Sequence, residues 1–88
     1  MINKTVKDYM EMKTERGTFI PVGSKAVGQT IQDVEKYGVK VEGYYQNPAT
    51  FDQILKPEPS IELMVGMGLV IKGQRSRIKN LCEALDLP

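Results

Sequence analysis

The spacing of apolar residues predicts that the chain begins with a short helix and continues as one small domain. Val6, Tyr9 and Met10 recur at three- and four-residue intervals, which is the pattern of an amphipathic helix. We expect this connector helix to occupy residues 1–16. The remaining residues, 17–88, are expected to form a single folded domain, because a chain of this length fits one compact unit.

Two further helices are predicted from apolar stripes. The first lies between Ser24, its expected N-cap, and Gly38, its expected stop. Its stripe consists of Val27, Ile31, Val34 and Tyr37. The second helix closes the chain and is expected to open at Gln74 or Ser76. Its stripe consists of Ile78, Leu81, Cys82 and Leu85.

Strands are predicted where apolar residues are β-branched or alternate with polar ones. "TFIPV" at 18–22 is such a run, and its proline favours an edge strand. "VKVEGYY" at 39–45 and "TFDQIL" at 50–55 both alternate. On the first of these strands, one face carries Val39, Val41, Gly43 and Tyr45. "QNPAT" between them is a predicted turn, and "KPEPS" at 56–60 cannot be regular structure because its prolines lack N–H donors.

The most hydrophobic stretch, "LMVGMGLVIKG" at 63–73, is interrupted by three glycines. A dinucleotide loop needs Gly-x-Gly-x-x-Gly between a strand and a helix, but here more strand-like residues follow Gly68. A Walker loop needs its lysine after a glycine, whereas Lys72 precedes Gly73. The apolar part is also far shorter than the ~20 residues of a membrane-spanning helix. The stretch is therefore predicted to be a bend at Gly66 and an interior strand that ends at Gly73.

The predicted order of elements is helix, strand, helix, three strands and helix. This order is typical of an α+β fold. We expect a small sandwich with a β-α-β-β-β-α core after the connector helix. Its one four-stranded sheet, mostly antiparallel or mixed, would be covered by the helices.

Composition narrows the classes of function. The chain has no histidine and a single cysteine, Cys82, so the commonest general base and metal ligand are missing. We therefore expect no enzyme, no catalytic residues and no metal site. A lone cysteine and a start without a secretion signal favour the cytoplasm. The net charge of +1 gives no general argument for nucleic acid or for an anionic membrane.

Four segments occur in an order that resembles a known family. They are "SKAVGQTI" at 24–31, "YGVKV" at 37–41, "PEP" at 57–59 and "LMVGMGLVIKG" at 63–73. This order is similar to the C-terminal subdomain of RCK (regulator of potassium conductance) proteins, the TrkA-C domain. Gln29 and Met67 stand where that family usually has lysine and aspartate. The resemblance implies a TrkA-C-like fold over nearly the whole chain.

The resemblance also implies a cytoplasmic regulatory domain that pairs as a homodimer. Such a domain would sit on a potassium channel pore or a transporter subunit, peripheral to the membrane and without inserting into it. In several relatives a small ligand, often a cyclic dinucleotide, binds between the two copies. Carried onto this sequence, the ligand-binding residues would be Val39, Lys40, Val41, Pro57 and Pro59. Because Lys40 replaces a usual asparagine and "QDVEKYG" is shortened and acidic, an unidentified ligand or none remains an alternative.

A basic segment offers a second candidate site. "KGQRSRIK" at 72–79 holds four positive charges, and Arg75 and Arg77 could bind an anion at the start of the last helix. The same segment could equally be a solvated helix face.

Two alternative functions stand beside the ligand-sensing domain. One is a dimerisation scaffold without a ligand, and the other is a small nucleic-acid-binding module that would use the basic segment. Nucleic acid is not expected, because no aromatic platform is interleaved with the basic residues.

Overall fold

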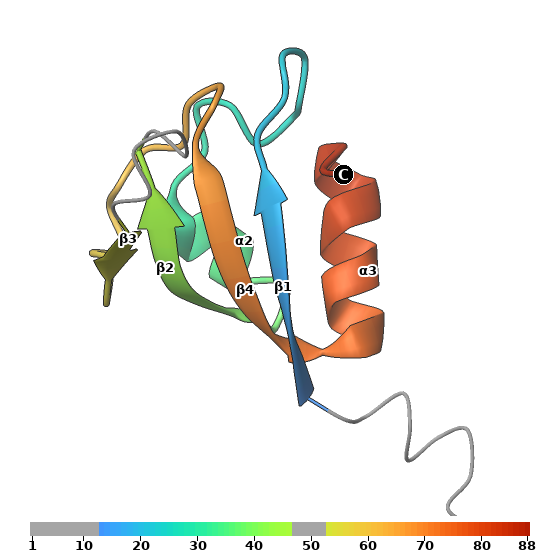
Figure 1. The fold of residues 1–88 in the computed structure, drawn as a ribbon. Helices are drawn as coiled ribbons and strands as arrows, with labels where there is room; N and C mark the ends of the chain where they lie inside the picture. Colours follow the sequence, from blue (N-terminus) through green and yellow to red (C-terminus); the bar gives the residue numbers. More distant parts are fainter. Residues whose placement is uncertain (1–12, 47–52) are drawn as a thin grey trace, which may run out of the picture.

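A computed structural model of the chain describes residues 13–46 and 53–88. The elements within these ranges are β1 (Lys13–Phe19), α2 (Ile31–Glu35), β2 (Lys40–Tyr45), β3 (Gln53–Leu55), β4 (Gly68–Gln74) and α3 (Arg75–Leu85). The strands form one sheet in the order β1-β4-β2-β3, and every pairing is antiparallel (Figure 1). The predicted α+β fold with one four-stranded sheet and covering helices is therefore confirmed.

The central strand β4 organises the core. Leu69 and Ile71 alternate with more exposed neighbours, as expected for a strand with one buried face. They belong to a single cluster with apolar side chains of both helices, such as Val34 and Leu81. Figure 1 shows α2 behind the sheet and α3 alongside β1. The stretch at 63–73 is thus a bend and an interior strand, as its pattern predicts.

The end of that strand was predicted wrongly. Gly73 does not stop β4, which continues to Gln74 and runs directly into α3 at Arg75. Gly73 is buried within the strand because Val39 packs against it. A Cβ atom at this position would lie 3.2 Å from Cγ1 of Val39. The glycine therefore serves the close approach of a neighbouring segment.

The edge strand β1 begins earlier than predicted. Residues 13–16, expected at the end of the connector helix, are strand, so that prediction is wrong over these four residues. Each of them pairs with a residue of β4, and this ladder outweighs a weak helical spacing. The edge position is confirmed, with Pro21 just beyond the strand. The rest of the expected helix, 1–12, lies outside the described residues.

Helix α2 is much shorter than the predicted 24–37. Gly28 has a φ of +88°, which interrupts any helix started at Ser24. The N-cap is instead Thr30, which forms a capping box with Asp33. The Ser24 hydroxyl donates to the carbonyl oxygen of Leu85 at 2.6 Å and so ties this loop to α3. The N-cap prediction at Ser24 is wrong, because its hydroxyl joins the N–H of Ala26 to the carbonyl oxygen of Leu85 in a turn that Gly28 ends before any helix forms.

Strand β2 carries a bulge that changes which tyrosine is buried. The register shifts between Val41 and Gly43, so the strict alternation of the sequence is broken there. As a result Tyr44, opposite Leu69, lies in the core, whereas Tyr45 is only half-buried. The predicted face with Val41 and Tyr45 together is therefore wrong.

The strand predicted at 18–22 is wrong beyond Phe19, where β1 ends, and the remaining predictions agree with the structure where it describes the chain. The α3 stripe is buried, comprising Ile78, Leu81, Cys82 and Leu85. Its N-cap is Gln74, which makes no side-chain capping hydrogen bond. Residues 56–60 form no helix or strand. Strand β3 covers the last three residues of the predicted strand, while 50–52 and most of the predicted turn lie outside the described residues.

Candidate functional site

Three strands surround a hollow at one end of the sheet, where β1 and β2 begin and β4 ends. Its volume is about 390 Å³, and it is lined by Lys13, Gly38, Val39, Lys40, Glu42, Lys72 and Gly73. We call it the lysine hollow. Antiparallel pairing assembles it, because the ladder sets Lys40 opposite Lys72 and Lys13 opposite Gln74. Two of the five predicted ligand residues, Val39 and Lys40, thus share one site.

A tight turn between α2 and β2 shapes one wall of the lysine hollow. Gly38 has a φ of +86°, and its N–H donates to the carbonyl oxygen of Glu35 at 3.0 Å. A Cβ atom here would lie 2.6 Å from a guanidinium nitrogen of Arg77. Only glycine combines this backbone conformation with this close contact. The turn fixes where Val39 and Lys40 enter the site.

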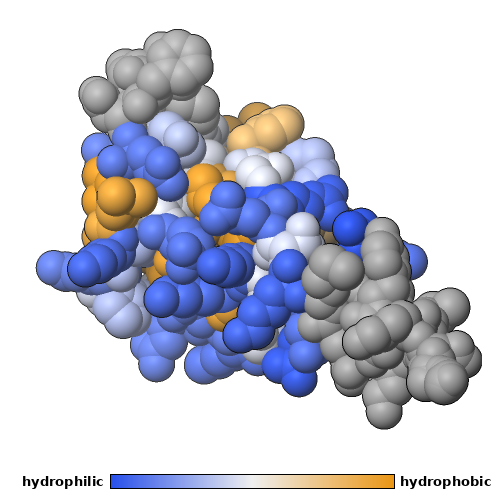
Figure 2. Space-filling view, turned by 60° about the horizontal axis from the view of Figure 1, so that its bottom comes forward, coloured by the Kyte–Doolittle hydropathy of each residue, from blue (hydrophilic) through white to orange (hydrophobic). Residues whose placement is uncertain are grey.

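The charges of the lysine hollow favour an anion. Three lysines and one glutamate line it, so two positive charges remain. Lys40 and Glu42 form an exposed ion pair, with 3.7 Å between Nζ and Oε2, which is worth only ~0–1 kcal/mol. Figure 2 turns this end of the molecule toward the reader, and its described surface is largely hydrophilic. The site therefore suits a polar, negatively charged ligand.

The other three predicted ligand residues do not line this hollow. Val41 is buried in the core, and its N–H donates to Oε2 of Glu35 at 3.0 Å. Pro57 and Pro59 belong to the loop before residue 61, which is held against α2. There the carbonyl oxygen of Pro59 accepts the N–H of Gln32 at 3.0 Å. Whether a second copy brings these residues to the ligand stays a prediction.

The predicted anion pair is divided. Arg77 packs over Gly38, next to the lysine hollow. Arg75 instead lines a separate hollow between β1 and α3, together with Arg16 and Lys79. Arg75 and Arg77 therefore do not form one anion site, because they lie on different faces of α3.

Sequence reasoning missed Lys13 and Gly73 as site residues, and treated Lys72 only as part of a basic run. Lys13 was assigned to a helix, and nothing in its local pattern contradicts that. The signal that would have found these residues is the strand register, which pairs β4 with both β1 and β2. Local periodicity does not specify which strands become neighbours.

In the described part of the chain, two ionisable groups have perturbed pKa values, and neither lines the lysine hollow. Hydrogen bonds from the Thr30 N–H and hydroxyl lower the pKa of Asp33. Burial raises the pKa of the Cys82 thiol, although the positive charge of Arg16 opposes this. Among residues 13–46 and 53–88, no group of three or more acidic or cysteine side chains could hold a metal ion.

No protein-family model matches the chain, and a search of curated proteins finds no match. Among solved structures, one described as the GsuK channel bound to NAD has a similar fold, with a TM-score of 0.64 and 19% sequence identity. The similarity covers 81% of this chain and 13% of that chain. The chain therefore spans a small part of the channel's length. No helix in the described part of the chain is long and apolar enough to cross a membrane.

Proposed function

We propose that the chain is a cytoplasmic regulatory domain of a potassium channel or of a potassium or cation transport system. The observation that carries this proposal is the fold likeness to part of the GsuK channel. Two of the RCK-like segments, at 37–41 and 63–73, support it, since they contribute to the turn and the strands at the centre of this fold. "YGVKV" forms the turn and strand that line the lysine hollow, and "LMVGMGLVIKG" forms the bend and the central strand.

The ligand we propose for the lysine hollow is a small anion of the cyclic dinucleotide type. The hollow has room for part of such a molecule and carries excess positive charge. The acidic segment before β2 repels an anionic ligand less than its sequence suggests. The Glu35 carboxylate accepts a hydrogen bond from the N–H of Val41. Lys40, in place of the usual asparagine, adds a charge that attracts phosphate.

We further propose that a second copy of the chain packs beside β3. Leu55 on this short edge strand is 66% exposed, and Ile54 is also exposed. The next residue, Lys56, donates its N–H to the carbonyl oxygen of Glu42 at 3.4 Å. Because Glu42 lines the lysine hollow, the start of the Pro57 loop lies close to it. A partner at this edge would thus complete a ligand cleft that includes the predicted prolines.

Regulation would follow from a shift between dimer geometries. A ligand that binds one geometry more tightly than the other pulls the attached pore or transporter toward that state. Its effect is limited by the difference in affinity, which is typically about 1–3 kcal/mol per coupled site. No covalent chemistry is required of the chain.

Isothermal titration calorimetry on the 88-residue chain tests the ligand. The panel contains cyclic dinucleotides, ATP, ADP and divalent cations, and a thermal-shift measurement accompanies each titration. We expect saturable heat and a raised melting temperature with a phosphate-bearing member. If no member gives heat or a thermal shift, the ligand-sensing function is wrong and the dimerisation scaffold replaces it.

Sedimentation tests the pairing. We expect two copies at micromolar concentration, and Leu55→Asp should increase the monomer fraction because it places a charge on the proposed contact. Val22→Asp is the matched control, since Val22 is 86% exposed on the loop after β1 and away from β3. A monomeric wild-type chain, or equal effects of the two variants, would contradict the proposed interface.

A further inference from the structure

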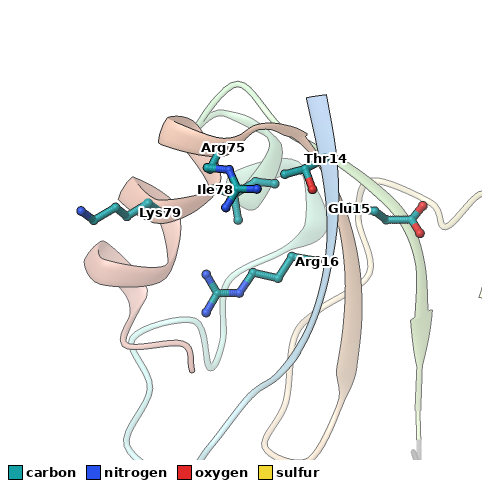
Figure 3. Close-up of a pocket in the computed structure, with 6 residues that line it drawn as sticks. All are labelled: Thr14, Glu15, Arg16, Arg75, Ile78 and Lys79. Carbon is teal, nitrogen blue, oxygen red and sulfur yellow. The ribbon is translucent and has the colours of Figure 1, made fainter. Parts of the chain in front are cut away.

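A second basic hollow lies between the edge strand β1 and helix α3 (Figure 3). Its volume is about 320 Å³, and it is lined by Thr14, Glu15, Arg16, Arg75, Ile78 and Lys79. We call it the arginine hollow. It is built from two elements that are far apart in sequence and are held together by the core. Its residues are all different from those of the lysine hollow.

The strand and the helix each contribute one face to this hollow. Along β1, Thr14 and Arg16 pair with the buried positions Gly73 and Ile71, on the face that the helices cover. Glu15, between them, extends to the other side of the strand in Figure 3. The carboxylate therefore does not lie among the cationic groups.

On α3, the three lining residues share one helical face. Arg75, Ile78 and Lys79 are spaced by three and four residues, so their side chains are neighbours. Ile78 is buried and gives the hollow an apolar floor. The small Thr14 leaves room above it. The arrangement is an apolar base with positive groups on two walls.

Positive groups gather in this hollow at the start of a helix. Arg75 is the first residue of α3, whose first turn has no acidic side chain and whose N-cap makes no side-chain hydrogen bond. A helix N-terminus carries partial positive charge, so cations there are unfavourable. Neither Arg16 nor Lys79 takes part in the ion pairs that join Lys36 to Asp33 and Lys40 to Glu42. A bound anion would relieve this accumulation of charge.

We propose that the arginine hollow binds a phosphate-bearing small molecule. The guanidinium group of Arg16 faces the helix, where its paired N–H donors suit phosphate oxygens, and Arg75 on the helix adds a second charge, whereas the Lys79 ammonium group extends away from Arg16. An apolar part of the ligand would rest on Ile78. The hollow size is that of a small-ligand site. This inference concerns a site on the opposite face of β1 and does not rest on the regulatory function.

An NMR titration of the ¹⁵N-labelled 88-residue chain with inorganic pyrophosphate, at constant ionic strength, tests the proposal. We expect saturable shifts of the amides at 14–16 and 75–79. Arg16→Gln should weaken binding by about threefold to tenfold, because an exposed charge-assisted contact is lost. Lys79→Gln should act in the same direction but more weakly, because its ammonium group extends away from Arg16. Both residues are exposed, so the variants should keep the wild-type spectrum elsewhere.

Lys25→Gln is the control, because it removes one exposed positive charge from the loop before α2. It should leave the pyrophosphate affinity unchanged. Equal weakening by Lys25→Gln and Arg16→Gln would show general charge attraction and overturn the proposal. Shifts that do not saturate, or that appear at Lys13, Lys40 and Lys72 without those at 14–16 and 75–79, would overturn it as well.

Discussion

The two basic hollows lie on opposite faces of the same edge strand, and they differ in how their charges are arranged. In the lysine hollow, the backbones of three strands bring Lys13 and Lys72 together, and Glu42 partly offsets the charge. In the arginine hollow, a strand and a helix face each other over an apolar floor, and the lining acid extends away. Strand alternation thus sends adjacent residues of β1 to different sites.

The largest effect on stability is expected from a substitution of Ile78, the apolar floor of the arginine hollow. Ile78→Ala removes a buried side chain from the core and should lower the free energy of unfolding by about 2–5 kcal/mol. Urea unfolding measures it. Lys79→Ala, the exposed neighbour on the same helix, is the control and should change stability by less than about 0.5 kcal/mol. Equal stabilities of the two variants would mean that Ile78 does not support this part of the core.

A smaller loss is expected from the turn that shapes the lysine hollow. Gly38→Ala forces a Cβ atom against Arg77 at a φ of +86°, which should lower the free energy of unfolding by about 1–3 kcal/mol. Gly17→Ala is the matched control, because a Cβ at Gly17 meets nothing within 4 Å and its φ is not positive. If both variants unfold at the same urea concentration, the turn is not constrained as described.

Some elements of the fold could be predicted from the sequence, and others could not. The α3 stripe with Ile78 follows from local spacing, and so do most of β2 and β4, because each pattern contains its own periodicity. The start of α2 does not, since Gly28 and the Thr30 capping box decide it against a plausible cap at Ser24. The bulge in β2 could not be predicted from the sequence either, because it depends on how β2 pairs with β4.

The candidate sites were harder to predict than the fold. Val39 and Lys40 were identified through a family resemblance, and the structure places them together. Lys13 lines one hollow and Arg16 the other because β1 pairs with β4, whereas the sequence placed both residues in the predicted helix at 1–16. A site made by neighbouring strands depends on register, which a single sequence does not specify when the pattern of one strand is weak.

A pH dependence of stability should trace to α2, the helix that precedes the turn at Gly38. Asp33 has a lowered pKa in the fold, so its ionised form stabilises the folded state above its ordinary pKa. That contribution should be lost as the pH falls through the lowered value. We expect Asp33→Asn to reduce the acid dependence measured by urea unfolding, while Glu83→Gln, an exposed carboxyl on α3, serves as the charge-matched control. An unchanged acid dependence in Asp33→Asn would contradict this.

The most direct test of the regulatory account compares ligand affinity in Lys72→Gln and Arg16→Gln by calorimetry with a cyclic dinucleotide. The two residues lie on adjacent strands and line different hollows, so each variant is the control for the other. The account predicts a saturable site that Lys72→Gln weakens by about tenfold, as loss of one charged contact implies, and whose affinity Arg16→Gln leaves unchanged, since any binding at the arginine hollow is a separate step. Absence of binding to the wild-type chain, or equal weakening by both variants, would contradict it.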